Sequence, residues 1–117
     1  MAGTLEVTEE LCWMPAGWVF DMVLERMAAE LSTQAADLAD DLLAARTEAN
    51  GGYLDLRGKD LHTLERLIQA ADIAYERIEQ EGAQGLKAPE FYEGLLLQFQ
   101  QFRDMLYVGQ HRCMKPL

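Results

Sequence analysis

The stretch Asp60–Glu81, DLHTLERLIQAADIAYERIEQE, decides the fold class. Its apolar side chains recur at i, i+4, i+7, i+11 and i+14, the spacing that gathers them on one face of an α-helix. The members of this stripe are Leu64, Ile68, Ala71, Tyr75 and Ile78. Asp60 suits the N-cap, and Gly82 suits the end of the helix. The stretch therefore predicts an amphipathic helix with one buried face.

Three further segments show helical periodicity: residues 12–31 (CWMPAGWVFDMVLERMAAEL), 32–50 (STQAADLADDLLAARTEAN) and 88–108 (APEFYEGLLLQFQQFRDMLYV). Pro15 and Pro89 suit the first turn of a helix, where the missing N–H would have no partner. Ser32 or Thr33 suits the N-cap of the second segment, and Asn50 with Gly51 suits its end. We therefore predict an all-α fold, a bundle of four main helices in a single domain over residues 1–117.

The fourth segment carries a buried stripe of aromatic and leucine residues. Its members are Phe91, Leu95, Phe99, Phe102 and Leu106. Gly94 lies inside this helix and is interpreted as a point of close approach between helices. The ends of the chain, EVTEEL and QHRCMKPL, are predicted to be tails that either pack on the bundle or are held by a neighbouring molecule.

The glycine-rich stretch NGGYLDLRGKD, residues 50–60, resembles a phosphate loop only superficially. A P-loop has four residues between its glycines and Ser or Thr after the lysine, whereas Gly52 and Gly58 have five residues between them and Asp60 follows Lys59. We interpret the stretch as a connector that places Leu54 and Leu56 against the core. Pairing with LEVTE would make a very short two-stranded element near residues 5–9 and 53–57.

The charge balance limits the kinds of partner that the protein is expected to bind. Ten basic residues against twenty acidic ones give a net charge of −10 and a pI near 4.5. This charge disfavours nucleic acid and favours a basic protein. No secretory signal and no apolar run of roughly 20 residues is visible, so we expect a cytoplasmic protein without a membrane segment. A disulfide between Cys12 and Cys113 is not expected, although the sequence leaves their pairing open.

No catalytic constellation or cofactor motif is visible, and we predict neither enzymatic activity, a cofactor nor a metal. Cys12, His62, His111 and Cys113 lack the close spacing of a zinc site. The acids of the second and third helices recur at spacings of three and four and are Asp37, Asp40, Asp41, Asp72, Glu76 and Glu79. All-α magnesium-dependent nucleotide hydrolases use paired E-x-x-E and E-x-x-D motifs, which these acids match incompletely.

The small size, acidity, helical pattern and absence of a cofactor motif resemble the immunity proteins of bacterial toxin–immunity pairs, including type VI secretion and other polymorphic toxin systems. The resemblance is one of size and character rather than of a motif. It implies a protein that binds and inhibits a cognate toxin, with an acidic surface against a basic active site. The implied partner-binding residues are the six acids given above, with Trp13 or Trp18 as an apolar anchor.

Two other functions stay open from the sequence. One is a carboxylate-metal nucleotide hydrolase that uses magnesium or manganese on the second and third helices. The other is a helical adaptor or a homodimer that covers surplus apolar surface. The toxin, its activity and the inhibited face are not specified by the sequence.

Overall fold

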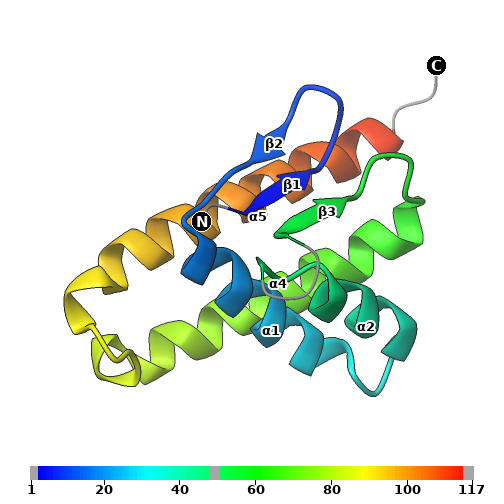
Figure 1. Cartoon of the computed structure of the whole chain (residues 1–117). Helices are drawn as coiled ribbons and strands as arrows, with labels where there is room; N and C mark the ends of the chain where they lie inside the picture. Colours follow the sequence, from blue (N-terminus) through cyan, green and yellow to red (C-terminus); the bar gives the residue numbers. More distant parts are fainter. Residues whose placement is uncertain (1–2, 48–50, 115–117) are drawn as a thin grey trace.

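The computed structural model describes residues 3–47 and 51–114. This part of the chain is mostly helical, with four α-helices and a small three-stranded sheet (Figure 1). The helices are α1 (Gly17–Leu31), α2 (Ala36–Ala44), α4 (Leu61–Glu81) and α5 (Tyr92–Met114). The strands are β1 (Thr4–Glu6), β2 (Cys12–Trp13) and β3 (Tyr53–Asp55). The short 3-10 helices η1 (Ala83–Gly85) and η2 (Pro89–Phe91) connect α4 to α5.

Helix α4 forms as its sequence predicts. The Asp60 carboxylate accepts a hydrogen bond from the backbone N–H of Thr63 at 2.8 Å, which satisfies one of the unpaired donors at the helix start. The same hydrogen bond lowers the pKa of the Asp60 carboxyl. At the other end, Gly82 adopts φ +69°, a conformation that residues with a side chain rarely adopt. The predicted cap of this helix is confirmed, and Asp60 occupies the position that a phosphate would need.

The predicted pairing near residues 5–9 and 53–57 is formed by β1 and β3, and β2 adds a third strand that was not expected. Strand β1 lies in the centre, parallel to β3 and antiparallel to β2, so that Leu5 is opposite both Leu54 and Trp13. The Thr8 hydroxyl accepts from the backbone N–H of Leu11 at 3.1 Å and helps turn the chain back toward β2. Val7 is 4% exposed, so the segment EVTEEL packs on the core, which is the first of the two arrangements expected for it. Strand β2 has only two residues, which is too short for the alternation of buried and exposed side chains to be recognised in the sequence.

The first two helices are shorter than predicted. Pro15 precedes α1 rather than lying in its first turn, and its carbonyl accepts from the backbone N–H of Gly3 at 3.2 Å. Ser32 ends α1 instead of capping α2, because its hydroxyl donates to the carbonyl of Ala29 at 3.0 Å. Helix α2 begins only at Ala36. The proposed end at residue 50 lies outside the described residues.

Helix α5 continues beyond the predicted end, because the turn between β1 and β2 packs on its last turns. A Cβ placed on the buried Gly109 would lie 3.2 Å from a methyl group of Val7, and Arg112 pairs with Glu10 at 2.8 Å. Residues 110–114 are therefore the last turns of α5 and pack on the rest of the fold, the first of the two arrangements expected for this end. The prediction of a close approach at Gly94 is wrong, since a Cβ there would meet no atom within 4 Å.

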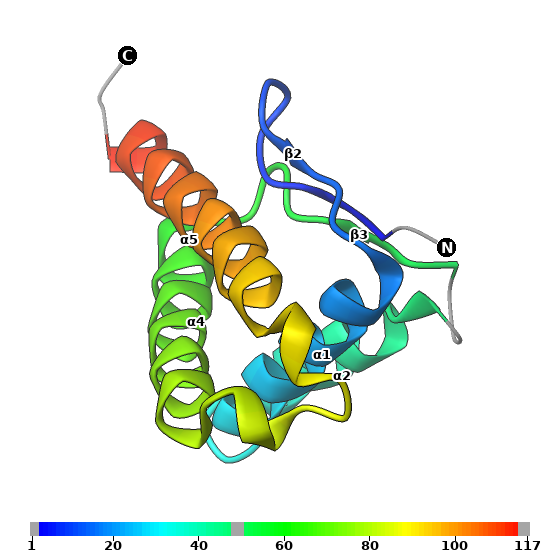
Figure 2. The ribbon, with the colours of Figure 1, turned by 90° about the vertical axis from the view of Figure 1, so that its left-hand side faces the viewer.

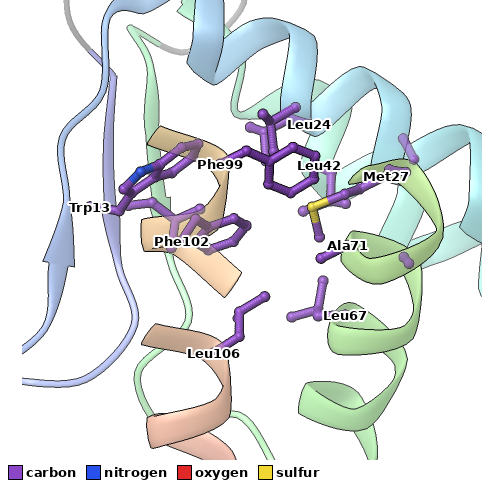
Figure 3. Close-up of a cluster of buried hydrophobic side chains, with 14 of the residues drawn as sticks. Trp13, Leu24, Met27, Leu42, Leu67, Ala71, Phe99, Phe102 and Leu106 are labelled. Atoms are coloured by element: carbon purple, nitrogen blue, oxygen red, sulfur yellow. The ribbon is translucent and has the colours of Figure 1, made fainter. Parts of the chain in front are cut away.

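One cluster of buried apolar side chains joins all four helices and the sheet. Helices α4 and α5 pack side by side, and α1 packs on both α2 and α4 (Figure 2). In the centre, the Trp13 ring stacks on Phe102 with ring centroids 4.5 Å apart, and Leu67 and Leu106 lie near them (Figure 3). Within the described ranges, no helix is both long enough and apolar enough to cross a bilayer.

Candidate functional site

Arginine side chains are bound to acids on neighbouring elements or turns, with N–O distances between 2.5 and 3.2 Å. The pairs are Arg26–Glu81, Arg46–Glu25, Arg57 with Asp55 and Glu6, Arg77–Glu30, Arg103–Asp72 and Arg112–Glu10. A further arginine, Arg66, donates to the His62 ring at 3.0 Å. Most of the positive charge is therefore paired with acids of the same molecule.

Many acids, in contrast, are exposed and make no ion pair within the part of the chain that the structure describes. They are Glu9, Asp37, Asp40, Asp41, Glu65, Glu76, Glu79, Glu90 and Glu93. Five of the six acids predicted from the sequence belong to this group. The excess of negative charge behind the net charge of −10 therefore lies on exposed carboxylates that an external cation can reach.

Asp72 is the exception among the predicted acids. Its carboxylate accepts from Arg103 at 3.0 Å and from the Tyr107 hydroxyl at 2.6 Å, both across the α4–α5 contact. The Arg103 guanidinium also lies 4.3 Å from the centre of the Tyr75 ring. The hydrogen bond to Asp72 raises the pKa of the Tyr107 phenol. Asp72 joins two helices, so we remove it from the set of surface residues that contact a partner.

The predicted acids do not converge on one metal site. Asp37 and Asp41 line a hollow between α2 and the start of α4 with Lys59, His62 and Arg66. No group of three His, Cys, Asp or Glu side chains in residues 3–47 and 51–114 is arranged to hold a metal ion. The arrangement of acids that a carboxylate-metal hydrolase would need on α2 and α4 is not formed.

The two tryptophans have different roles. Trp13 is 2% exposed, and its indole N–H donates to the Gln98 carbonyl at 2.9 Å, so the proposal of Trp13 as a surface anchor is corrected. Trp18 on the first turn of α1 is 43% exposed, and its ring centroid lies 6.1 Å from that of Phe91. Phe91 is itself 54% exposed instead of buried as its position in the predicted stripe suggested. Trp18 is therefore the tryptophan that a partner can reach.

Trp18 forms one wall of an apolar pocket of about 450 Å³. The lining residues outside α1 all belong to the connection between α4 and α5. Figure 2 draws this connection in yellow. The lining includes Trp18, Met22, Leu86, Lys87, Ala88 and Phe91. We call this hollow the Trp18 pocket. Its size and apolar lining suit one or two large apolar side chains or a small apolar molecule.

The pocket continues into an exposed face of α1. Trp18, Met22, Glu25 and Ala29 follow the i, i+4, i+7, i+11 spacing and define what we call the α1 strip. The strip is about 16 Å long at 1.5 Å per residue. At its far end, Glu25 and Ala29 line a second hollow of about 280 Å³ together with Asp40 of α2. The α1 strip thus connects an aromatic pocket with an unpaired carboxylate.

Sequence reasoning identified Trp18 and Asp40 but not the α1 strip that connects them. Glu25 and Ala29 look unremarkable in the sequence, and Phe91 belonged to a predicted helical core stripe. Two features of the sequence could have indicated the α1 strip. One is the set of α1 residues that lie opposite the buried stripe, and the other is the interruption of the helix at Pro89. Cys12 and Cys113 are free thiols, and neither lines the Trp18 pocket.

No protein-family model, curated protein or solved structure matches this chain.

Proposed function

We propose that this protein is an immunity-type inhibitor that binds a cognate bacterial toxin in the cytoplasm through its acidic surface. The toxin would present a basic active-site surface, as expected for an enzyme that acts on nucleic acids or nucleotides. Inhibition would then follow from covering that site, and the protein itself would need no catalytic residue.

The observation that supports this proposal is the unequal use of charge. All arginines except Arg66 are engaged in internal ion pairs. The acids Asp37, Asp40, Asp41, Glu76 and Glu79, in contrast, are exposed and unpaired within the described residues. Such an acidic surface accelerates encounter with a basic partner and repels nucleic acid. Since the arginine pairs already stabilise contacts between elements, a partner could engage the unpaired acids without breaking the fold.

The test is co-expression with the product of the neighbouring reading frame in a bacterial host. We expect that protein alone to arrest growth and this protein to restore it. Isothermal titration calorimetry should give a complex whose affinity falls as salt increases from 50 to 500 mM, by about tenfold or more.

A triple change of Asp37, Asp40 and Asp41 to Asn should weaken the complex. The control for net charge is an equally neutralised triple variant that combines Glu9→Gln, Glu65→Gln and Asp104→Asn at exposed positions. A neighbouring product that neither arrests growth nor binds would remove the support for an immunity role.

A further inference from the structure

The α1 strip and the Trp18 pocket together define a docking surface, and we propose that it receives a basic protein segment carrying a large apolar side chain. The apolar side chain would enter the Trp18 pocket, and a lysine or arginine of the same segment would reach Asp40. This inference rests on the proposed function, because it names the face by which a basic partner is held.

The apolar end of the surface has the character of an interaction hot spot. Trp18 and Phe91 are both large, aromatic and about half exposed, and their rings contact each other in the lining of the pocket rather than packing into the core. Aromatic side chains in such positions contribute most to binding when a partner excludes water from them. Burial of a partner side chain against both rings would remove this exposed apolar area.

The acidic end selects the charge of the occupant. Asp40 is exposed and makes no ion pair in the described ranges, and it lines the far hollow beside Glu25. Glu25 already binds Arg46 at 2.9 Å, so Asp40 is the carboxylate there that is open to an incoming cation. Near the other end, the exposed Glu90 and Glu93 flank Phe91 in the chain.

The charge of the whole chain argues against a second copy as the occupant. Two molecules of net charge −10 repel each other, whereas a basic segment is attracted to the same surface. The distance along the α1 strip, about 16 Å from Trp18 to Ala29, requires an occupant of several residues. A protein segment that alternates apolar and basic side chains satisfies both conditions.

The first experiment uses a synthetic amphipathic peptide of leucine and lysine, followed by nitrogen–proton correlation spectra of the labelled protein. The two indole N–H signals are assigned with Trp18→Phe. We expect the Trp18 signal to shift on titration and the buried Trp13 signal to stay in place. Shifts confined to α5, around the exposed Leu97, would overturn the proposal.

The second experiment measures binding of the neighbouring reading frame's product to matched variants. Trp18→Ala and Phe91→Ala should each weaken the complex by about tenfold to a hundredfold, whereas Leu97→Ala, a change at a 63% exposed leucine on α5, should change it less than about twofold. Asp40→Asn should reduce the salt dependence, with Glu65→Gln, a change at an exposed acid outside the predicted binding set, as its control.

Ala29→Arg adds bulk and positive charge to the α1 strip at an exposed position, so the fold is retained even if Trp18→Ala destabilises it. It should weaken both the peptide and the protein complex.

The two proposals fail differently. Tight binding of the neighbouring product that is unaffected by Trp18→Ala, Phe91→Ala and Ala29→Arg keeps the inhibitor function and overturns this docking surface. Peptide binding at Trp18 without any complex with the neighbouring product keeps the surface and overturns the inhibitor function.

Discussion

The indole nitrogen of Trp13 donates to the backbone carbonyl of Gln98 at 2.9 Å, and the Gln98 side-chain oxygen accepts from the backbone N–H of Ala16 at 3.0 Å. Gln98 therefore holds both ends of the segment that connects β2 to α1. We expect Gln98→Ala to lower the free energy of unfolding by about 1 kcal/mol, the usual net value of a lost hydrogen bond. Urea denaturation would measure the change, with the exposed Gln101→Ala as the control.

Replacement of Trp13 tests the core beneath that segment. Trp13→Ala removes the ring stacked on Phe102 and should cost about 3–5 kcal/mol of stability. Trp18→Ala removes a ring of the same kind from the surface and should cost far less. Equal losses for the two variants in urea denaturation would contradict the burial described above.

Glycine substitutions should have opposite effects at two positions. A Cβ on Gly3 would lie 2.1 Å from the Phe20 ring, so Gly3→Ala should displace β1 or the ring and lower the melting temperature. A Cβ on Gly94 would meet no atom within 4 Å, so Gly94→Ala should stabilise the protein by about 0.5–1 kcal/mol through helix propensity. Thermal denaturation of both variants checks the prediction, and a destabilised Gly94→Ala would contradict it.

The Arg26–Glu81 pair should make a pH-dependent contribution to stability. The hydrogen bond from Arg26 holds the pKa of the Glu81 carboxyl below its ordinary value of 4.5. A carboxyl with a lowered folded-state pKa stabilises the fold above 4.5, and this contribution is lost as the pH falls through the folded-state pKa. Glu81→Gln should therefore melt at a lower temperature than the parent at pH 7, and the difference should vanish well below pH 4.5. A difference that is constant with pH would rule out the linkage.

Divalent cations should act on this protein only as general electrolytes. Because the acids of α2 and α4 do not converge, magnesium or manganese should raise the melting temperature no more than sodium chloride of equal ionic strength does. A saturable increase well above that control would instead support the carboxylate-metal hydrolase.

At low ionic strength the free protein should be monomeric. Leu97 and Met14 are more than 60% exposed, but the charge of −10 opposes self-association through them. Light scattering should give a mass of 13.2 kDa across concentrations. A mass that rises toward twice this value as the protein concentration increases would favour the homodimer.

Prediction of secondary structure from the sequence was most accurate where the apolar face of one long helix determines the structure by itself. In α4, every member of the apolar stripe except the half-buried Tyr75 is buried, and Asp60 caps the helix. Prediction was wrong where tertiary contacts override local preference. Pro15 suits the first turn of a helix, but its carbonyl accepts a hydrogen bond from the backbone N–H of Gly3. Gly3 lies outside the predicted helix, so the helical pattern does not reveal this contact. A sheet that joins residues about fifty positions apart leaves only a weak local signal.

The candidate site was predictable only in its individual residues. Acidity and spacing indicated Asp37, Asp40 and Asp41, but the same properties indicated Asp72, whose partners Arg103 and Tyr107 come from another helix. No local pattern distinguishes an acid that joins two helices from one that faces solvent. The pocket lined by Trp18 and Phe91 depends on how the α4–α5 connection folds back on α1. The apolar periodicity of α1, α4 or α5 does not specify the path of this connection.

The central position of β1 has a consequence for folding during synthesis. Leu5 leaves the ribosome long before Leu54, its parallel partner, and before Phe102, on which its neighbour Trp13 stacks. The nascent chain must therefore carry the apolar side chains of β1 and β2 without their core partners until α5 is made, because pairing with β3 across such a loop gains little before the core is complete. We expect ribosome-bound chains that end before residue 92 to recruit chaperones, and the final helix to convert them in one cooperative step.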